Sequence, residues 1–281
     1  MLDRIVSRRR VRRQSPVPQD MLIGVAAGMI GIVRAEALIG QASSPSHVSP
    51  ACSGGLFAPS RPSAASGIAP TQARAHSNGM EPQTVTIADV PAMPDAGVRL
   101  LKRRFGQVRC FLEYGAGGST ALAAQHGVPK IYSVESDAAY VAAVEAKVAA
   151  IGSGSNLHAI YADIGPTGGF GHPRDQSGIE RWPAYSAHVW DVMAGAGDTP
   201  DMILVDGRFR VACCLRSFMK MSENAILVFD DYFDREDRYG IVTRFAPIVK
   251  QVDRLALFRK PRDVDLAAME EVYREYAVKP A

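Results

Sequence analysis

The chain has 281 residues, of which 47% are hydrophobic and 22% are charged, so it is long enough for one folded domain with an appended segment. Its formal net charge of +3 is unevenly distributed. Residues 1–80 hold nine Arg against three acidic residues, whereas the remaining residues hold 23 basic and 26 acidic side chains. The part after residue 80 therefore lacks the basic surplus of a nucleic-acid-binding protein, and we expect no nucleic-acid partner.

The N-terminal segment has a composition of its own. A cluster of five arginines within residues 8–13 precedes a 13-residue run of apolar residues and glycine, which is shorter than the roughly 20 residues of a membrane-spanning helix. A basic cluster before a short apolar run resembles a signal sequence. The stretch that follows is rich in Ser, Pro, Ala and Gly, which is typical of disorder. We expect a disordered extension over residues 1–79 and a folded domain over residues 80–281; alternatively, residues 1–40 direct targeting or contact a membrane surface.

The four cysteines are Cys52, Cys110, Cys213 and Cys214, and they show neither a CxxC pair nor a zinc-site spacing. Cys110 lies in an apolar predicted strand, and the adjacent pair lies in a predicted helix. Buried free thiols in a reducing compartment explain this distribution best. We therefore expect a cytoplasmic protein without structural disulfides.

After residue 80 the hydrophobic pattern alternates between strands and helices. The expected strands are residues 108–113, 130–135, 157–162, 202–205, 225–229 and 254–259. The expected helices are residues 95–105, a segment from Ser119 that Ser119 or Thr120 caps, and residues 138–150 (capped by Asp137), 185–194, 211–221, 238–249 and 264–276. This alternation predicts an α/β fold, a Rossmann-like, doubly wound and mostly parallel sheet with helices on both faces. The loops after its parallel strands meet at one edge, where ligands bind.

Residues 108–120 are the most informative stretch, an apolar strand that runs through Glu113 into a glycine-rich turn over residues 115–118. A strand, such a turn and a helix form the usual frame for a nucleotide-like ligand. Glu113 would repel the pyrophosphate of a dinucleotide at the helix N-terminus, and the dinucleotide motif would need glycine in place of Thr120. S-adenosylmethionine (SAM) has no phosphate and carries a cationic amino-acid end, so this sequence favours SAM over NAD.

Carboxylates also follow the later strands of the predicted sheet. Glu135 ends the second strand, where it can accept both hydroxyls of a ribose, and Asp163 follows the third, placed to meet an adenine amino group. The fourth and fifth strands end in Asp206 and in the pair Asp230 and Asp231. One acidic residue after a strand is commonly a helix cap or a turn former. Acidic residues after five successive strands instead indicate a ligand-binding rim.

With these residues the chain resembles the class I SAM-dependent methyltransferases over about residues 108–259. The resemblance rests on residues 112–120, 133–137, 161–163, 201–207 and 226–232. It implies that the methionine part of SAM contacts Glu113 and the glycine turn, the ribose contacts Glu135, and the adenine contacts Ala162 and Asp163. The full set of cofactor-binding residues that it implies is Glu113, Tyr114, Gly115, Ala116, Gly117, Gly118, Ser119, Glu135, Ser136, Ala162 and Asp163.

The acidic residues after the fourth and fifth strands resemble, in layout, those of the metal-dependent O-methyltransferases of the catechol and macrocin types. The resemblance implies that Asp206, Asp230 and Asp231 hold Mg²⁺, a cation that prefers oxygen ligands. Alternatively, the adjacent pair only caps a turn, and Asp206 is a lone base or binding group. Methyl transfer to oxygen needs a group that removes the proton of the acceptor, so Asp206 is the catalytic candidate.

Two arginines follow Asp206 directly. Arg208 and Arg210 could bind a carboxylate or phosphate of the substrate, or, as we favour, they pair with the acidic side chains of Asp206 and Asp231. The long loop over residues 165–183 is a candidate substrate lid. Its His172 is either an acid or base or, as we favour, a solvated loop residue.

The sequence therefore predicts an enzyme that transfers a methyl group from SAM to a small-molecule acceptor, at oxygen, with Mg²⁺ as a possible second cofactor. Two alternatives share the fold. The chain could be a non-catalytic module that binds SAM or a nucleotide, or it could be an aminopropyl-type transferase.

Overall fold

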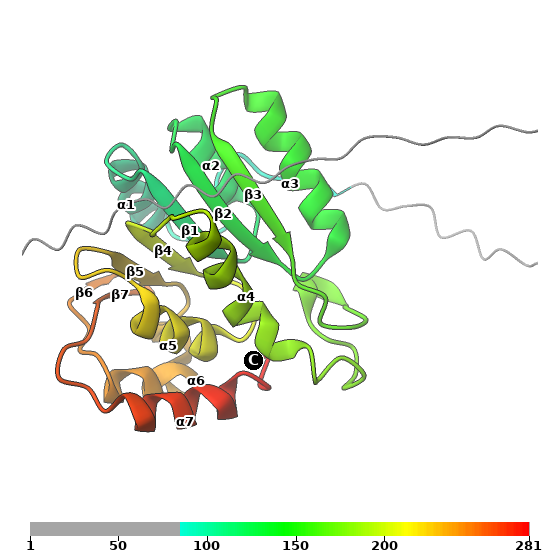
Figure 1. Cartoon of the computed structure of the whole chain (residues 1–281). Helices are drawn as coiled ribbons and strands as arrows, with labels where there is room; N and C mark the ends of the chain where they lie inside the picture. Colours follow the sequence, from blue (N-terminus) through cyan, green and yellow to red (C-terminus); the bar gives the residue numbers. More distant parts are fainter. Residues whose placement is uncertain (1–84, 281) are drawn as a thin grey trace, which may run out of the picture. The chain divides into compact units, whose positions relative to one another are not determined.

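The computed structural model describes residues 85–280, so the predicted extension over residues 1–79 and Cys52 lie outside the described residues. A seven-stranded sheet with the strand order β3-β2-β1-β4-β5-β7-β6 forms the centre of the domain (Figure 1). Its strands are β1 (Cys110–Tyr114), β2 (Lys130–Glu135), β3 (Asn156–Tyr161), β4 (Met202–Val205), β5 (Ile226–Phe229), β6 (Lys250–Val252) and β7 (Leu255–Arg259). Strands β1 to β5 are parallel, and β7 runs antiparallel to β5 and β6. The predicted Rossmann-like α/β fold is confirmed.

Helices cover both faces of this sheet. They are α1 (Asp95–Phe105), α2 (Gly118–Gln125), α3 (Ala138–Ile151), α4 (Trp182–Gly195), α5 (Arg210–Lys220), α6 (Glu236–Tyr239) and α7 (Leu266–Tyr276), with short 3₁₀ turns at Gly169–Gly171, Phe233–Arg235 and Gly240–Arg244. Helices α1, α2 and α3 pack into one hydrophobic core, and α4, α5 and α7 pack into a second. Figure 1 shows α4 and α5 in front of the sheet.

The two cores follow from the alternation of side chains along each strand. In β1, Phe111 faces the core under α1 to α3, and its neighbour Leu112 faces the core under α4, α5 and α7. In the parallel register, Leu112 lies beside Tyr132 of β2 and Ile203 of β4, which face the same way. Both faces are therefore apolar, as expected for parallel strands that are covered on both sides.

The C-terminal part differs from the prediction. The helix predicted over residues 238–249 is wrong, because the segment forms only the single turn of α6 and a 3₁₀ turn. Pro247 prevents a helix from continuing through this point. The chain then enters β6, which pairs with β7 across a tight turn at Asp253 (φ 55°). Strand β6 is short, with exposed Lys250 and Gln251, so it carries little hydrophobic pattern.

Helix ends confirm one capping prediction in full and one in part. The carboxylate of Asp137 accepts hydrogen bonds from the backbone N–H groups of Ala139 (2.8 Å) and Tyr140 (3.3 Å), as expected for the cap of α3. The N-cap of α2 is Gly117, and Ser119 and Thr120 lie inside the first turn, where both donate their hydroxyl groups to Glu113. Thr120 still contributes to the cap, because its hydroxyl oxygen accepts the backbone N–H of Gly117 at 3.0 Å.

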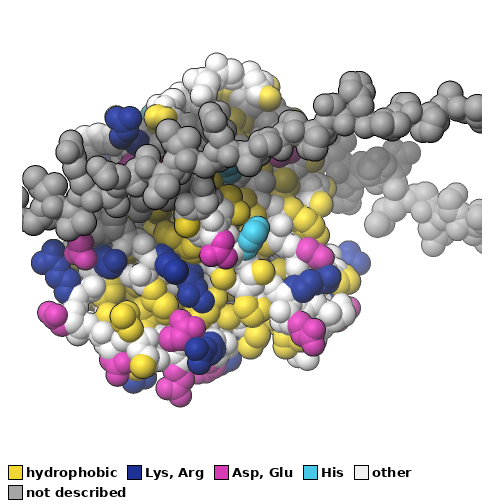
Figure 2. All heavy atoms as spheres, in the orientation of Figure 1, with side chains coloured by type: hydrophobic (Ala, Val, Ile, Leu, Met, Phe, Trp, Pro, Cys, Tyr) yellow, Lys and Arg dark blue, Asp and Glu magenta, His cyan; other side chains and the backbone are white. Residues whose placement is uncertain are grey.

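The distribution of charge on the surface and the state of the cysteines agree with what the composition predicts. On the face shown in Figure 2, basic and acidic side chains are interspersed over the part that holds α5 and α7. Cys110, Cys213 and Cys214 are buried free thiols, as predicted. Within residues 85–280, no helix combines the length and the apolar character needed to cross a membrane.

Candidate active site

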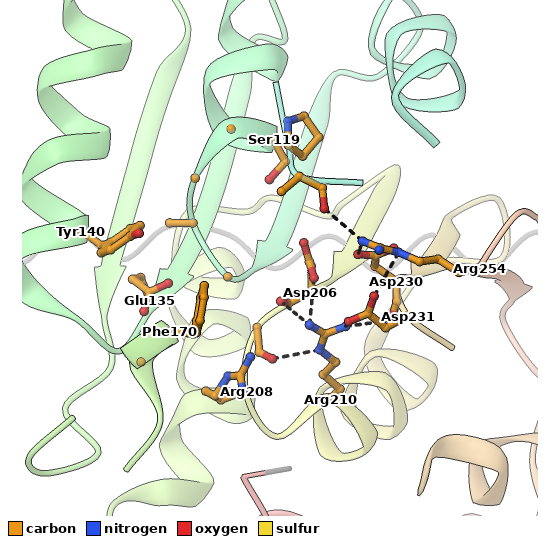
Figure 3. A pocket seen from close by; sticks show the side chains of 18 residues that line it. Ser119, Glu135, Tyr140, Phe170, Asp206, Arg208, Arg210, Asp230, Asp231 and Arg254 are labelled. Atoms are coloured by element: carbon orange, nitrogen blue, oxygen red, sulfur yellow. Dashed lines mark hydrogen bonds and ion pairs between the residues drawn. The ribbon is translucent and has the colours of Figure 1, made fainter. Parts of the chain in front are cut away.

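A cavity of about 290 Å³ lies at the carboxyl edge of the sheet (Figure 3). The glycine turn after β1 forms one wall, and the loops after β4 and β5 form another. The lining residues are Pro91, Ala92, Gly115, Ala116, Gly117, Gly118, Ser119, Glu135, Tyr140, Phe170, Gly171, Asp206, Gly207, Arg208, Arg210, Asp230, Asp231 and Arg254. The sequence therefore predicted the edge correctly, and the fold brings the glycine turn, Glu135 and the acidic residues after β4 and β5 to one place.

Close backbone contacts explain two of the glycines in the turn. Gly115 has a φ of +99°, and a Cβ atom there would lie 2.8 Å from the backbone of Gly207. The turn after β1 therefore packs directly against the turn after β4. A Cβ atom on Gly118 would lie 2.2 Å from the carbonyl oxygen of Val90, so the segment before α1 packs on the start of α2.

Glu113 lies beneath the glycine turn and does not line the cavity. Its side chain is fully buried, and it accepts hydrogen bonds from the hydroxyl groups of Ser119, Thr120 and Ser133, the last at 2.7 Å. The pKa of Glu113 is raised to about 7, chiefly because the carboxyl group is buried, although the three hydroxyl groups lower it. The resemblance implies a contact with the methionine part of SAM. From this position we instead expect Glu113 to hold the first turn of α2 in place.

Glu135 lines the cavity at the end of β2. Its Oε1 accepts hydrogen bonds from the backbone N–H groups of Ser136 (2.6 Å) and Asp137 (3.0 Å), and burial raises its pKa. Figure 3 shows Tyr140 and Phe170 near it at the same end of the cavity. Phe170 is 89% exposed and adopts a left-handed backbone conformation (φ 57°) in the loop after β3.

Tyr114 points away from the cavity. Its hydroxyl group donates to the carbonyl oxygen of Ser186 at 3.0 Å and accepts from the indole N–H of Trp190 at 2.8 Å. Both partners belong to α4, and the Tyr114 side chain is fully buried. The side chain of Tyr114 therefore joins β1 to α4.

Three other predicted cofactor residues do not line the cavity. Ser136 is buried, and its hydroxyl group donates to the carbonyl oxygen of Gly171 at 3.1 Å. Ala162 is also buried. The carboxylate of Asp163 forms an ion pair with Arg181 at 2.9 Å. Contacts of these residues with a cofactor stay predictions.

Asp206, Asp230 and Asp231 converge as predicted, because one carboxylate oxygen of each lies within 4.8 Å of the others. Asp230 and Asp231 follow β5, and Asp206 follows the neighbouring β4. Asp231 adopts a left-handed backbone conformation (φ 57°), which Asp tolerates better than most residues. The local sequence thus suits the turn that brings both acidic side chains of this pair to the cluster.

The guanidinium groups of Arg210 and Arg254 lie against this acidic cluster (Figure 3), and the more exposed Arg235 pairs with Asp231 at 3.4 Å. Arg210 is almost fully buried and forms ion pairs with Asp206 (2.9 Å) and Asp231 (3.2 Å). Arg254 forms ion pairs with Asp230 (2.9 Å) and Asp231 (3.0 Å). The predicted pairing with Asp206 and Asp231 is confirmed for Arg210 and wrong for Arg208, which forms no ion pair with any residue from 85 to 280. Arg254 was not recognised as a site residue, because its place beside β5 depends on the β6–β7 hairpin.

These residues do not fit a magnesium ion. Mg²⁺ requires near-octahedral oxygen ligands and keeps several of its waters, but every carboxylate of the cluster already binds a guanidinium group. A divalent cation among the same oxygens would lie beside two buried or half-buried positive charges, which is electrostatically unfavourable. The arginines supply the positive charge that the resemblance assigns to a metal.

Asp206 is the most exposed of the three acidic residues that line the cavity: 28% of its side chain is exposed, against 1% for Asp230 and 13% for Asp231. Its pKa is raised to about 7. Burial is the main cause; the charge of Arg210 lowers the pKa, and the charges of Asp230 and Asp231 raise it. A carboxyl group with a pKa near neutrality that faces a cavity is suited to accept a proton.

Comparison with known proteins identifies the family. No family model and no curated protein matches the chain. Among solved structures, a methyltransferase-like protein from Silicibacter pomeroyi is 32% identical and matches 69% of this chain and 100% of its own, with a TM-score of 0.61. This chain belongs to the class I methyltransferase family. Family membership explains why the cavity lies at the end of β1, β2 and β4, where a nucleotide-like ligand binds in this type of sheet.

Two further solved structures match with lower identity. Cofactor-bound Rv0187 from MTB is 16% identical over 61% of this chain and 83% of its own, with a TM-score of 0.43. The O-methyltransferase TomG from Streptomyces achromogenes, solved in complex with SAM, is 14% identical over 61% of this chain and 82% of its own, with a TM-score of 0.44.

The structure also adds residues that sequence analysis did not single out for this methyltransferase. Pro91 and Ala92 line the cavity from the segment before α1, and the side chain of Arg254 donates to the carbonyl oxygen of Ala92 at 3.0 Å. Tyr140 and Phe170 line its other end. The lid predicted over residues 165–183 contributes only Phe170 and Gly171 to the lining.

Proposed function

We propose that this chain transfers the methyl group of SAM to an oxygen atom of a small-molecule acceptor, without a metal ion. The observation that carries the proposal is the meeting of three groups in one cavity: the glycine turn after β1, Glu135 and Asp206. The backbone contact between Gly115 and Gly207 keeps the turn next to Asp206. A cofactor held by the turn and by Glu135 then lies beside a candidate base.

SAM, when bound, supplies a methyl group on a positively charged sulfur. In the transfer, the bond between that sulfur and the methyl carbon breaks while a bond from the acceptor oxygen to the same carbon forms. The chain has to hold the two reactants in line and to take the proton of the acceptor. Asp206 accepts that proton, because its pKa of about 7 makes the carboxylate available at neutral pH.

Arg210 keeps this base in place, and Arg254 pairs with the two neighbouring carboxylates, those of Asp230 and Asp231. They neutralise most of the negative charge that Asp206, Asp230 and Asp231 would otherwise carry together. Arg210 also donates hydrogen bonds to the carbonyl oxygens of Gly207 (3.0 Å) and Asp230 (2.8 Å). It thereby joins the loop after β4 to the loop after β5, which limits the positions that Asp206 can take.

Calorimetric titration of the full chain with SAM tests the cofactor part of the proposal. We expect micromolar binding by the wild type and at least a tenfold loss in the Glu135→Ala variant, because a hydrogen-bonding group for the ribose is removed. The Glu145→Ala variant is a matched control, because Glu145 is an exposed side chain on α3, and it should bind like the wild type. A well-folded wild type that does not bind SAM would contradict the proposal.

Turnover separates this proposal from its alternatives. A methyltransferase releases S-adenosylhomocysteine when it is incubated with SAM and an acceptor library. A non-catalytic module would bind SAM and release nothing above background, and an aminopropyl-type transferase would require decarboxylated SAM and release methylthioadenosine. Mass spectrometry of the products distinguishes the three.

A further inference from the structure

Arg208 differs from the other arginines that line the cavity. Arg210 and Arg254 both form ion pairs with the acidic cluster. Among residues 85–280, none forms an ion pair with Arg208, and its buried Nε atom has no hydrogen-bond partner. Taking a charged group out of water without a partner is unfavourable. A half-buried guanidinium group in a cavity is therefore a candidate binding group for a negatively charged ligand.

The backbone of Arg208 is held in place, although its guanidinium group has no partner in the described part of the chain. Its N–H group donates to the hydroxyl group of Tyr185 at 3.2 Å, and its carbonyl oxygen accepts from the thiol of Cys213 at 3.4 Å. Burial lowers the pKa of Arg208, and the neighbouring charge of Arg210 lowers it further. An anion beside Arg208 would favour the charged guanidinium group and so raise this pKa again.

The residue that follows Arg208 has a strained backbone. Phe209 adopts a left-handed conformation (φ 52°, ψ 37°), which is uncommon for a bulky side chain. Its ring is buried against Trp182 and Tyr185, with centroid distances of 5.6 and 5.4 Å. This conformation buries Phe209 in the core and leaves both Arg208 and Arg210 at the cavity. Strain of this kind is often found at ligand-binding sites.

The ion pairs on this side of the cavity leave Arg208 without a partner among the described residues. The carboxylates of Asp206, Asp230 and Asp231 pair with the guanidinium groups of Arg210, Arg235 and Arg254. The fourth carboxylate of the lining, that of Glu135, accepts hydrogen bonds from the backbone N–H groups of Ser136 and Asp137. Within residues 85–280, Arg208 is therefore the basic side chain of the lining that has no ion pair. Near it, His172 has a pKa lowered by burial and by the charges of Arg208 and Arg235. A neutral His172 can still donate one N–H group to an anion.

We propose that Arg208 binds an anionic group of the acceptor substrate, a carboxylate or a phosphoryl group, and so selects acidic acceptors. This inference rests on the proposed methyltransferase function. The planar guanidinium group can donate two parallel hydrogen bonds to either kind of anion. Arg208 lies two residues after Asp206 in the chain, so an acceptor that binds Arg208 would lie beside the candidate base.

Binding of small probes to the full chain saturated with S-adenosylhomocysteine tests this inference. The probes are benzoate, phenyl phosphate and the uncharged benzamide, each titrated by ligand-observed NMR. We expect the wild type to bind benzoate or phenyl phosphate at least tenfold more tightly than benzamide, and Arg208→Gln to lose that preference. The stronger of the two anions shows whether the natural group is a carboxylate or a phosphoryl group. Arg208→Lys should retain part of the preference, because it keeps the charge but not the planar fork.

A control variant and the SAM affinity of Arg208→Gln show whether the effect belongs to binding of the acceptor. Arg262→Gln also removes one positive charge, from a 79% exposed side chain that does not line the cavity, and it should keep the preference for anions. Equal binding of the three probes by the wild type, or the same preference in Arg208→Gln, would overturn the inference. A tenfold or greater loss of SAM affinity in Arg208→Gln, with anion binding intact, would also overturn it. Failure of the wild type to bind SAM contradicts the proposed function itself.

Discussion

Nη2 of Arg210 lies 2.9 Å from Oδ1 of Asp206, and both side chains line the same cavity. The two residues are four positions apart, at the end of β4 and the start of α5. Arg210 is almost fully buried, whereas Asp206 keeps 28% of its side chain exposed. The pair therefore places a stabilised carboxylate at the wall of the cavity, where a ligand can reach it, and leaves its positive partner behind it.

Activity should depend on the protonation of Asp206. Its pKa is raised to about 7, and only the deprotonated form accepts a proton, so kcat/KM should rise about tenfold per pH unit below pH 7 and level off above it. The Asp206→Asn variant should lose at least about 100-fold in kcat, in the range of a lost general base. Initial rates from pH 5.5 to 8.5 measure this. A flat profile in the wild type would show that Asp206 is not the base.

Metal removal should leave the activity unchanged. All three carboxylates of the acidic cluster are paired with Arg210 or Arg254, so there is no available set of oxygen ligands for Mg²⁺ in this cluster. Rates in EDTA and in Mg²⁺ should agree within twofold, and calorimetric titration with MgCl₂ should give no saturable heat. Loss of turnover in EDTA that Mg²⁺ restores would contradict the metal-free mechanism.

Glu113 should make the protein less stable as the pH rises. In the folded state the pKa of Glu113 is about 7, whereas the pKa of an unperturbed Glu is 4.5. Between these values the folded state binds more protons than the unfolded state, so this group lowers the free energy of unfolding by up to about 1.4 kcal/mol per pH unit. Urea unfolding at pH 5, 6 and 7 should show a shallower decline for Glu113→Gln. Equal slopes for this variant, the wild type and the exposed-site control Glu145→Gln would refute the effect.

Adjacent glycines in the turn should respond differently to substitution. In Gly118→Ala the new methyl group would lie 2.2 Å from the carbonyl oxygen of Val90, so the backbone must move. We expect a loss of about 1–3 kcal/mol in the free energy of unfolding and weaker SAM binding. A Cβ atom on Gly117 would meet no atom within 4 Å, and Gly117→Ala is the matched control. Equal effects of the two variants on unfolding would contradict the packing argument.

Several features of the fold and site could be predicted from short stretches of sequence. The apolar runs correctly indicated β2 over residues 130–135 and α1 over residues 95–105, because these elements carry their own hydrophobic pattern. The carboxylates after β4 and β5 were expected to meet, since the ends of parallel strands share one edge of a sheet. Family resemblance rested on the same local motifs, and the comparison with a 32% identical protein supports it.

Tertiary structure alone decided which of the charged side chains are buried or paired. Arg254 reaches Asp230 because β7 pairs with β5, and the sequence pattern did not show the β6 partner of β7. Glu113 can be buried because three hydroxyl groups from α2 and β2 donate hydrogen bonds to its carboxyl group. Local sequence determines which elements form and which polar side chains end them, because hydrophobic periodicity acts over a few residues. Burial and ion pairing depend on distances between segments that are far apart in the chain, so only the folded structure determines which charges are neutralised and which face a ligand.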